Sequence, residues 1–458
     1  MIKKLLGEYG MVLILIGLCV LFSVLTLKVQ DPMGEAAVAQ LVGQAGKHAK
    51  PSDVILAVGA ANKDSAPFAE QLGEALQAAG FENARSVVGT PRDLRLALDA
   101  VRDEGKKVTA LATIDDIAKW RLVERIPELY PEFAECQVWT PTARMWPVFL
   151  RPDNLLAVVD RIVVIAVIAI GMTMVILTAG IDLSVGSLIA LSAVVATLVM
   201  KKLGGLEAPA WVVGLGFLAG IASCGVVGAA GGLLVARFRV PPFITTLAVM
   251  MMARGLAFMI TGGFSIYQVP DALPWLGQGR TFGVPNTVIL LVLLYAGAHI
   301  FMSHTRLGRN IYAVGGNEEA ARLSGVNVGF VLVFVYVISA LSAGLGGCIQ
   351  ASQINTGTPN MGMMFELYVI AAVVVGGTSL SGGSGRILGT LIGAFIISVI
   401  QNGMNLLSVD SYTQQVVLGS VILGAVLLDK VRSTGGVSGL LRKKTAGAPI
   451  NQVPKETT

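Results

Sequence analysis

Long apolar runs separated by short polar links fill most of the chain after residue 150. A helix needs about 20 mainly apolar residues to cross a bilayer, and ten runs reach or approach that length. They lie at 11–28, 158–179, 183–200, 211–235, 242–262, 285–303, 328–350, 366–378, 387–405 and 413–429. The pattern predicts an all-α polytopic membrane protein with about ten transmembrane helices.

The first apolar run, 11–27, follows Lys3 and Lys4 and has two possible interpretations. It resembles a signal peptide in its charge and length, but no pair of small residues suited to cleavage follows in 27–32. We therefore favour an uncleaved first span.

Residues 29–150 have the composition of soluble protein and a different periodicity. Short apolar runs predict strands at 53–59, 86–88 and 107–112, and amphipathic patterns predict helices at 67–79, 92–104 and 114–123. Strands that alternate with helices predict a small parallel α/β domain, inserted after the first span. No phosphate-binding glycine pattern follows Gly59, so nucleotide binding is excluded here. Helix packing, docking and a remnant ligand-binding lobe remain open as roles.

The expected organisation is a first helix at 1–28, an extracytoplasmic α/β domain at 29–150, a transmembrane core at 151–435 and a disordered cytoplasmic tail at 436–458. Basic residues orient the spans, because they gather in cytoplasmic loops. With both termini cytoplasmic, the inner side carries Arg237, Arg239, Arg306, Arg309, Arg322, Arg386 and the basic tail. Lys201 and Lys202 are the exception. This orientation makes 304–327 a cytoplasmic loop.

A short polar insert within that loop, 315–325, predicts a two-turn helix with both ends specified. Asn317 suits the N-cap, Glu318 and Glu319 suit the positive end of the helix dipole, and Gly325 suits a left-handed C′ position. Within the helix, Glu318 and Arg322 are spaced for an ion pair, while Ala320 and Leu323 form a small apolar spot; Ser324 follows. A helix this short is marginal alone, so we expect a soluble partner to dock on it.

A second break in the apolar pattern, 178–187, contains Gly180, Asp182, Ser184 and Gly186. Asp182 either caps the next helix from a turn at the inner surface, or shapes the inner gate or a contact with the partner. A weak echo follows 197 residues later, at Gly377, Ser381 and Gly383. The echo is either a remnant of an internal repeat or a chance match, and these seven residues are the gate candidates.

Composition excludes several classes of function. The chain is 54% hydrophobic and 14% charged, with a mean hydropathy of +0.72, which excludes an ordinary soluble protein. The net charge of +5 reflects basic residues beside the spans and does not indicate nucleic-acid binding. Four scattered cysteines predict no disulfide framework or zinc site, and no metal or cofactor motif occurs. No P-loop is present, so the chain is not expected to be an enzyme.

Polar side chains within the spans are few, and most are expected to bond to the backbone or to neighbouring helices. They are Ser223, Thr245, Thr246, Arg254, Ser339, Ser342, Gln350, Glu366, Ser398, Gln401, Asn402 and Asn405. Few intramembrane carboxylates or histidines argue against proton or sodium coupling, so energy has to come from another subunit.

Four segments together resemble the permease subunits of ribose, galactose and xylose ABC importers. These are 149–155, 171–186, 308–325 and 376–383, and the resemblance covers 149 to about 428 with a similar first span. It implies a homodimeric or pseudo-dimeric pore in the bacterial inner membrane, a cytoplasmic ATPase and an outer sugar-binding protein. The helix at 318–324 would then be the coupling helix that the ATPase holds.

The chain departs from that family in its outer segment, where about 120 residues replace a short link. The expected function is import of a monosaccharide through the lipid bilayer. A membrane receptor that senses through the outer domain and a secondary carrier remain the alternatives. Dependence on ATP and on a separate ATPase separates the importer from both.

Overall fold

A computed structural model describes residues 2–30, 34–62, 65–142 and 144–433. It divides into two compact units, one formed by Met1–Thr26 with Phe149–Thr458 and the other by Leu27–Val148. The tail 436–458 that the sequence predicts to be disordered lies outside the described residues.

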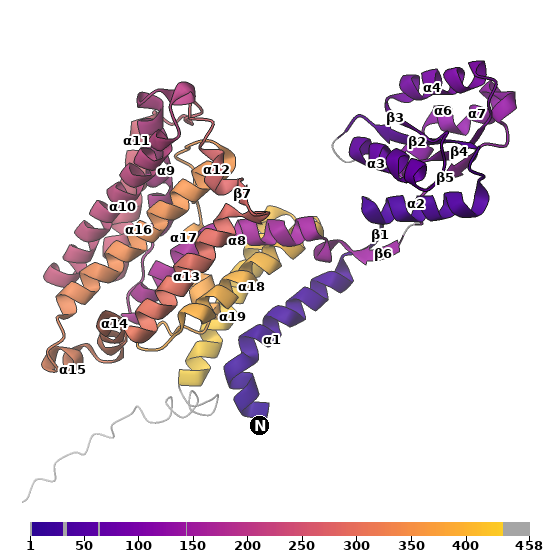
Figure 1. Cartoon of the computed structure of the whole chain (residues 1–458). Coiled ribbons are helices and arrows are strands. Elements are labelled where there is room, and N and C mark those ends of the chain that lie inside the picture. The colour runs from indigo at the N-terminus through magenta and orange to yellow at the C-terminus, as the bar shows by residue number, and fades with distance from the viewer. Residues whose placement is uncertain (1, 31–33, 63–64, 143, 434–458) are drawn as a thin grey trace, which may run out of the picture. The chain divides into compact units, whose positions relative to one another are not determined.

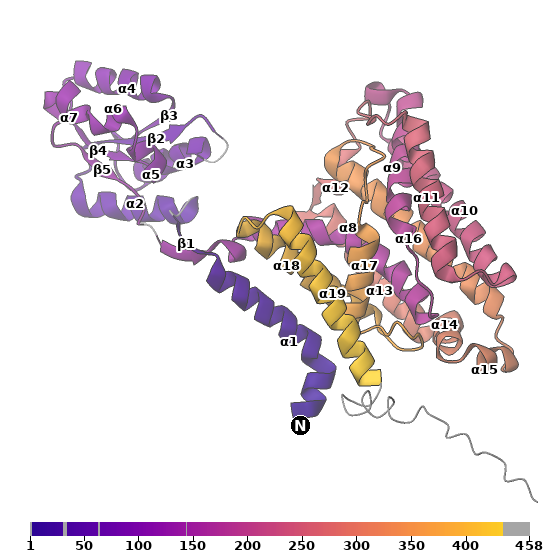
Figure 2. The same cartoon turned by 180° about the vertical axis from the view of Figure 1, so that it is seen from behind.

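The smaller unit contains a parallel four-stranded sheet in the order β3-β2-β4-β5. Its strands are β2 (Val54–Ala60), β3 (Arg85–Gly89), β4 (Val108–Ala112) and β5 (Gln137–Trp139). Helix α3 (Ser65–Ala78) connects β2 to β3 and lies with α2 (Glu35–His48) on one face, while α4 (Pro91–Asp103) covers the other (Figures 1 and 2). β1 (Leu27–Gln30) pairs antiparallel with β6 (Arg144–Pro147), which joins the two ends of the unit.

The three predicted strands, β2, β3 and β4, lie within a residue or two of their expected positions. β2 and β4 are short apolar runs that are largely buried, whereas β3 is an edge strand and only half-buried. The single helix predicted at 114–123 is wrong. The structure has two short helices there, α5 (Asp115–Ala118) and α6 (Arg121–Glu124), followed by α7 (Ile126–Leu129). Ile117, Val123 and Ile126 are buried, so each short helix packs one residue into the core of the smaller unit.

A carboxylate caps α4, and this cap predicts a pH effect. The Asp93 carboxylate accepts from the Thr90 backbone N–H and hydroxyl, both at 2.7 Å, and these bonds lower the pKa of Asp93. The stabilisation is therefore present above the unfolded-state pKa of about 4 and is lost as pH falls through the lower folded-state pKa. Asp93→Ala is expected to speed hydrogen exchange in the first turn of α4 at neutral pH, and the difference from wild type should shrink below about pH 4.

Asp103→Ala is the matched control, because Asp103 lies in the last turn of the same helix, where a negative charge opposes the helix dipole. Faster exchange in the Asp103 variant than in the Asp93 variant would contradict the capping role.

The larger unit is helical. Among the described residues, seven helices are long and apolar enough to cross a membrane: α8 (Pro152–Leu177), α9 (Val185–Lys202), α10 (Trp211–Phe238), α11 (Pro242–Thr261), α13 (Asn286–His304), α16 (Val328–Ile354) and α18 (Ile387–Leu406). Shorter apolar segments occur at Gly10–Leu25 within α1 (Ile2–Leu25), at α17 (Phe365–Val375) and at Ser411–Leu427 within α19 (Ser411–Ser433). These ten segments correspond to the ten predicted runs.

Helix α16 packs against α8, α9 and α10, and glycines bring these helices close together. A Cβ on Gly171 of α8 would lie 2.5 Å from the Ser339 Cα, and one on Gly228 of α10 would lie 2.4 Å from the Ala340 Cβ. Figure 2 shows α17, α18 and α19 side by side in the same unit. Close helix packing through small residues is typical of proteins in lipid.

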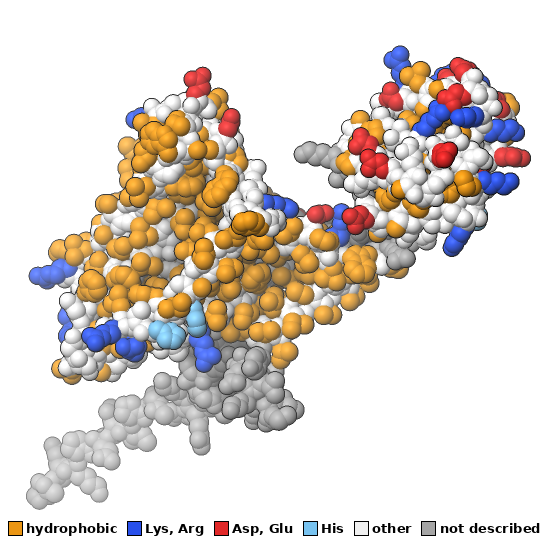
Figure 3. Space-filling view, viewed as in Figure 1, with side chains coloured by type: hydrophobic (Ala, Val, Ile, Leu, Met, Phe, Trp, Pro, Cys, Tyr) orange, Lys and Arg blue, Asp and Glu red, His pale blue; other side chains and the backbone are white. Residues whose placement is uncertain are grey.

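The surface of this unit separates apolar from basic side chains. In Figure 3, apolar side chains cover α10, α13 and α16, and Lys and Arg side chains gather near α14 (Arg306–Gly316) and α15 (Glu318–Leu323). The exposed arginines at this end include Arg237, Arg239, Arg306, Arg309, Arg322 and Arg386. An apolar band with a basic end is the pattern expected of a membrane-spanning unit.

Candidate functional site

Helix α15 has the caps that the sequence predicts. The Asn317 side-chain oxygen accepts from the Ala320 N–H at 2.9 Å, and Gly325 has φ of +83°. Two bonds close the C-terminus, from the Gly325 N–H to the Arg322 carbonyl and from the Val326 N–H to the Ala321 carbonyl, both 3.0 Å. This pair of bonds is the Schellman motif. The Arg322 Nη2 lies 2.5 Å from the Glu318 Oε1, which confirms the predicted ion pair.

The outward face of α15 is not covered by any other residue that the structure describes. Leu323 is 85% exposed, and Glu319, Ala320 and Ser324 are exposed as well. Ala321 is buried and attaches the helix to the protein. An exposed leucine on a short, well-capped helix favours a protein contact, because the caps fix the helix shape before any partner binds.

The polar insert at 315–325 contains α15 and also the end of another helix. Gly315 and Gly316 end a separate amphipathic helix, α14, which sequence analysis missed. Thr305 caps α14 by accepting from the Gly308 N–H at 3.0 Å, and Ile311 and Val314 bury its inner face. The signal was present in the sequence, since apolar residues 311 and 314 lie three apart after a threonine cap.

Gly315 brings the helix pair into direct backbone contact with both turn segments. A Cβ at Gly315 would lie 1.6 Å from the Leu177 carbonyl oxygen and 2.7 Å from the Gly383 nitrogen. The Gly383 N–H donates to that same Leu177 oxygen at 2.9 Å, and the Tyr312 hydroxyl donates to the Gly385 carbonyl at 3.0 Å. The end of α14, the end of α8 and the 376–385 turn therefore meet at one point, which we call the glycine junction (Leu177, Gly315 and Gly383).

Asp182 is buried, at 2% exposure, and its carboxylate has three donors. They are the Ser184 N–H at 2.9 Å, the Ser184 hydroxyl at 2.6 Å and the Ser339 hydroxyl of α16 at 2.7 Å. The prediction that Asp182 caps the next helix is wrong. Ser184 is the N-cap of α9, and Asp182 instead links the turn before α9 to α16 through its hydrogen bond with Ser339.

This arrangement predicts a clear stability effect. Asp182→Ala would leave the Ser184 and Ser339 hydroxyls without their shared acceptor and is expected to destabilise the protein by about 2 to 3 kcal/mol. Asp182→Asn keeps one oxygen acceptor and is expected to cost less. Thermal unfolding of the purified protein in detergent measures both, and equal stability of the alanine variant and wild type would contradict the assignment.

Gly186 lies in a different cluster, beside Arg254 of α11. The Arg254 Nη1 donates to the carbonyls of Pro359 and Met361, both at 2.7 Å, and Nη2 donates to the Gly186 carbonyl at 3.3 Å. A Cβ on Gly186 would meet the Glu366 Oε2 at 2.1 Å. Arg254 thus holds the start of α9 against the non-helical segment that precedes α17.

The structure therefore brings together only some of the gate candidates. Gly383 lies in the glycine junction, and Gly180 follows α8 close to the Tyr336 hydroxyl. Gly377 and Ser381 are part of the same turn as Gly383, with Ser381 exposed. Gly377 and Gly383 have positive φ, of +86° and +73°, whereas Gly180 and Gly186 do not, so the sequence echo does not give two equal turns.

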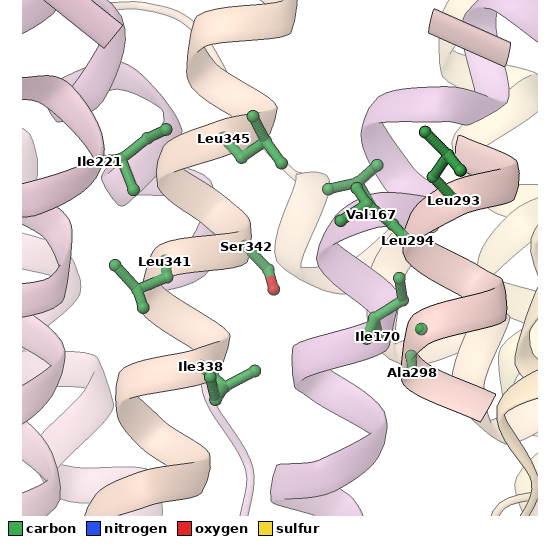
Figure 4. A pocket seen from close by; sticks show the side chains of 11 residues that line it. Val167, Ile170, Ile221, Leu293, Leu294, Ala298, Ile338, Leu341, Ser342 and Leu345 are labelled. Carbon is green, nitrogen blue, oxygen red and sulfur yellow. The ribbon is translucent and has the colours of Figure 1, made fainter. Parts of the chain in front are cut away.

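An apolar cavity of about 380 Å³ lies between α8, α13 and α16. Figure 4 shows Val167 and Ile170 of α8 and Leu293 of α13 facing Ile338 and Leu345 of α16. Ser342 supplies the polar atom seen among the labelled side chains (Figure 4). This lining does not suit a sugar, whose hydroxyl groups need polar partners. Among the residues that the structure describes, no group of His, Cys, Asp or Glu side chains is arranged to hold a metal ion.

Long apolar helices with a basic end define this chain as a polytopic membrane protein. It belongs to the family of permease components of branched-chain amino acid transport systems, whose model matches residues 154–427.

Three relatives illustrate the similarity. The ribose import permease protein RbsC of Escherichia coli K12 is 45% identical over 288 residues, covering 62% of this chain and 87% of the relative. RbsC of Bacillus subtilis is 44% identical over 290 residues, with 63% and 88% covered. The D-allose transport system permease protein AlsC of Escherichia coli K12 is 38% identical over 285 residues, with 62% and 86% covered. No solved structure matches the chain.

Proposed function

We propose that this chain is the membrane-spanning permease subunit of a binding-protein-dependent ABC importer for a simple sugar. It belongs to a permease family. Its matches to relatives named for ribose, allose and galactose extend over 87%, 86% and 89% of the length of those relatives. The relatives named for ribose share the higher identities, so ribose is the first cargo to test. The chain hydrolyses no ATP itself in this proposal; a separate cytoplasmic ATPase supplies the energy.

The single observation that carries the proposed mechanism is the glycine junction beside a capped, outward-facing α15. In this mechanism the ATPase holds α15 through Leu323 and its exposed neighbours. Closure of the ATPase on ATP moves α15 and α14, and Gly315 passes the movement to the Leu177 and Gly383 backbones. The turns 178–186 and 377–383 then act as the inner gate.

The proposed topology has ten spans in the bacterial inner membrane, with both termini cytoplasmic. The exposed arginines near α14 and α15 support a cytoplasmic position for that end, because basic residues are retained there. The 27–148 unit then faces outside, where a sugar-binding protein delivers its cargo. A second copy of the chain completes the pore.

Reconstitution tests this proposal. The purified permease, its co-purifying ATPase and the sugar-binding protein are placed in vesicles, and uptake of radiolabelled ribose, allose and galactose is measured. Uptake of at least one sugar should require ATP and all three proteins. Uptake by the permease alone would indicate a secondary carrier instead. Sugar binding to the 27–148 unit without any uptake would favour a receptor.

A further inference from the structure

A polar groove of about 790 Å³ lies beside α15, on the same end of the helical unit. Its walls come from four places: Thr178 and Ala179 after α8, the end of α10 with the turn 239–242, Glu318 and Arg322 of α15, and the first residues of α16. The groove thus connects α15 with the chain that follows Leu177 of the glycine junction. A partner seated on the exposed face of α15 has direct access to it.

The charges in this groove do not balance. Glu318 is paired with Arg322 within α15. Arg239 is exposed and has no ion pair with any residue that the structure describes. The lining therefore carries one unpaired positive charge, which suits a carboxylate on whatever occupies the groove.

The backbone at Arg239 has a conformation that glycine adopts more easily than arginine. Arg239 ends α10 in the left-handed region, with φ of +54°, and its N–H bonds to the Leu234 carbonyl. Glycine is the residue that fits this position without strain. Ala179, which also lines the groove, has a positive φ as well, of +60°. Two strained residues other than glycine thus line one groove beside α15.

We propose that this groove is a second docking site for the cytoplasmic ATPase, in which Arg239 binds an acidic side chain of that subunit. The inference rests on the proposed function, since it takes the ATPase as the partner of α15. Arg239 gives that partner a charged contact next to the 178–179 turn, in addition to the apolar contact at Leu323. The ATPase would therefore hold the coupling helix and the turn at the same time.

Arg239→Gly provides the test, because the change removes the guanidinium and relieves the strained backbone. The permease is placed in nanodiscs of neutral lipid, and binding of the purified, co-purifying ATPase is titrated at several salt concentrations. We expect the variant to bind the ATPase about tenfold more weakly, with a flatter dependence of affinity on salt. Its thermal stability should equal or exceed that of wild type, which a purely structural role for Arg239 does not predict.

Arg237→Gln is the charge control, since Arg237 is an exposed arginine of the same helix end that does not line the groove. It should bind the ATPase like wild type. Unchanged affinity and salt dependence in Arg239→Gly would overturn the proposal. So would an effect seen only in nanodiscs with anionic lipid, because Arg239 would then bind headgroups. Failure of wild type to bind any ATPase would refute the proposed function itself.

Discussion

Leu323→Arg is expected to abolish ATP-dependent uptake while the protein still inserts into the membrane. Leu323 is 85% exposed on α15, so an arginine there disturbs no packing among the residues that the structure describes. It would instead place a long charged side chain in the apolar part of the proposed ATPase contact. A buried, unpaired charge at the centre of an interface costs several kcal/mol, which corresponds to a loss of affinity of about a thousandfold. Co-purification of the ATPase and uptake into vesicles measure the two effects.

Glu319→Arg should act in the same direction, because it reverses a charge at the N-terminus of α15 and places a long basic side chain on the same exposed helix. Leu96→Arg is the control for Leu323→Arg, because it makes the same substitution at another exposed leucine. Leu96 is 59% exposed on α4 of the smaller unit, so Leu96→Arg should leave ATPase binding unchanged. Normal uptake by the Leu323 and Glu319 variants would remove α15 from the coupling mechanism.

Gly315→Val should disrupt the glycine junction and stop uptake. Even the first carbon of a side chain would lie 1.6 Å from the Leu177 carbonyl oxygen, and both neighbours are backbone atoms that no rotamer change can move aside. Either α14 moves away or the Gly383 to Leu177 hydrogen bond breaks. We expect a loss of about 3 kcal/mol in stability or a displaced α14, and uptake near background in both cases.

Gly316→Ala is a closely matched control, since nothing lies within 4 Å of its Cβ position. This neighbour should retain wild-type uptake and unfolding temperature. If both variants behaved alike, the contact at Gly315 would have no role in transport. Uptake and thermal unfolding, measured on the same preparations, separate a loss of coupling from a loss of folded protein.

The contrast between these two glycines shows what sequence reasoning can reach. The caps of α15 depend on residues three to five positions apart, so Asn317 and Gly325 could be assigned from the sequence alone. Gly315 and Gly316 look identical in the sequence, and only the distant Leu177 and Gly383 backbones distinguish them. Long-range contacts between backbone atoms leave no pattern in a single sequence.

The same reasoning explains the outcome for Asp182 and for the smaller unit. A carboxylate near the start of a helix predicts a cap. Asp182 instead accepts a hydrogen bond from the Ser339 hydroxyl, 157 residues away, and so links its turn to α16. Strands β2 and β4 can be predicted from the sequence because each is a continuous apolar run. Sequence analysis missed β5, a three-residue strand whose place beside β4 depends on the fold around it.

A joint made of main-chain atoms has mechanical properties that side-chain contacts lack. Leucines and methionines can absorb a small displacement by changing rotamers, whereas the atoms around Gly315 have no such freedom. A shift at one side of this joint therefore has to appear at the other with almost the same size. A backbone contact therefore transmits displacement rigidly, and substitutions at neighbouring surface positions cannot make it more flexible.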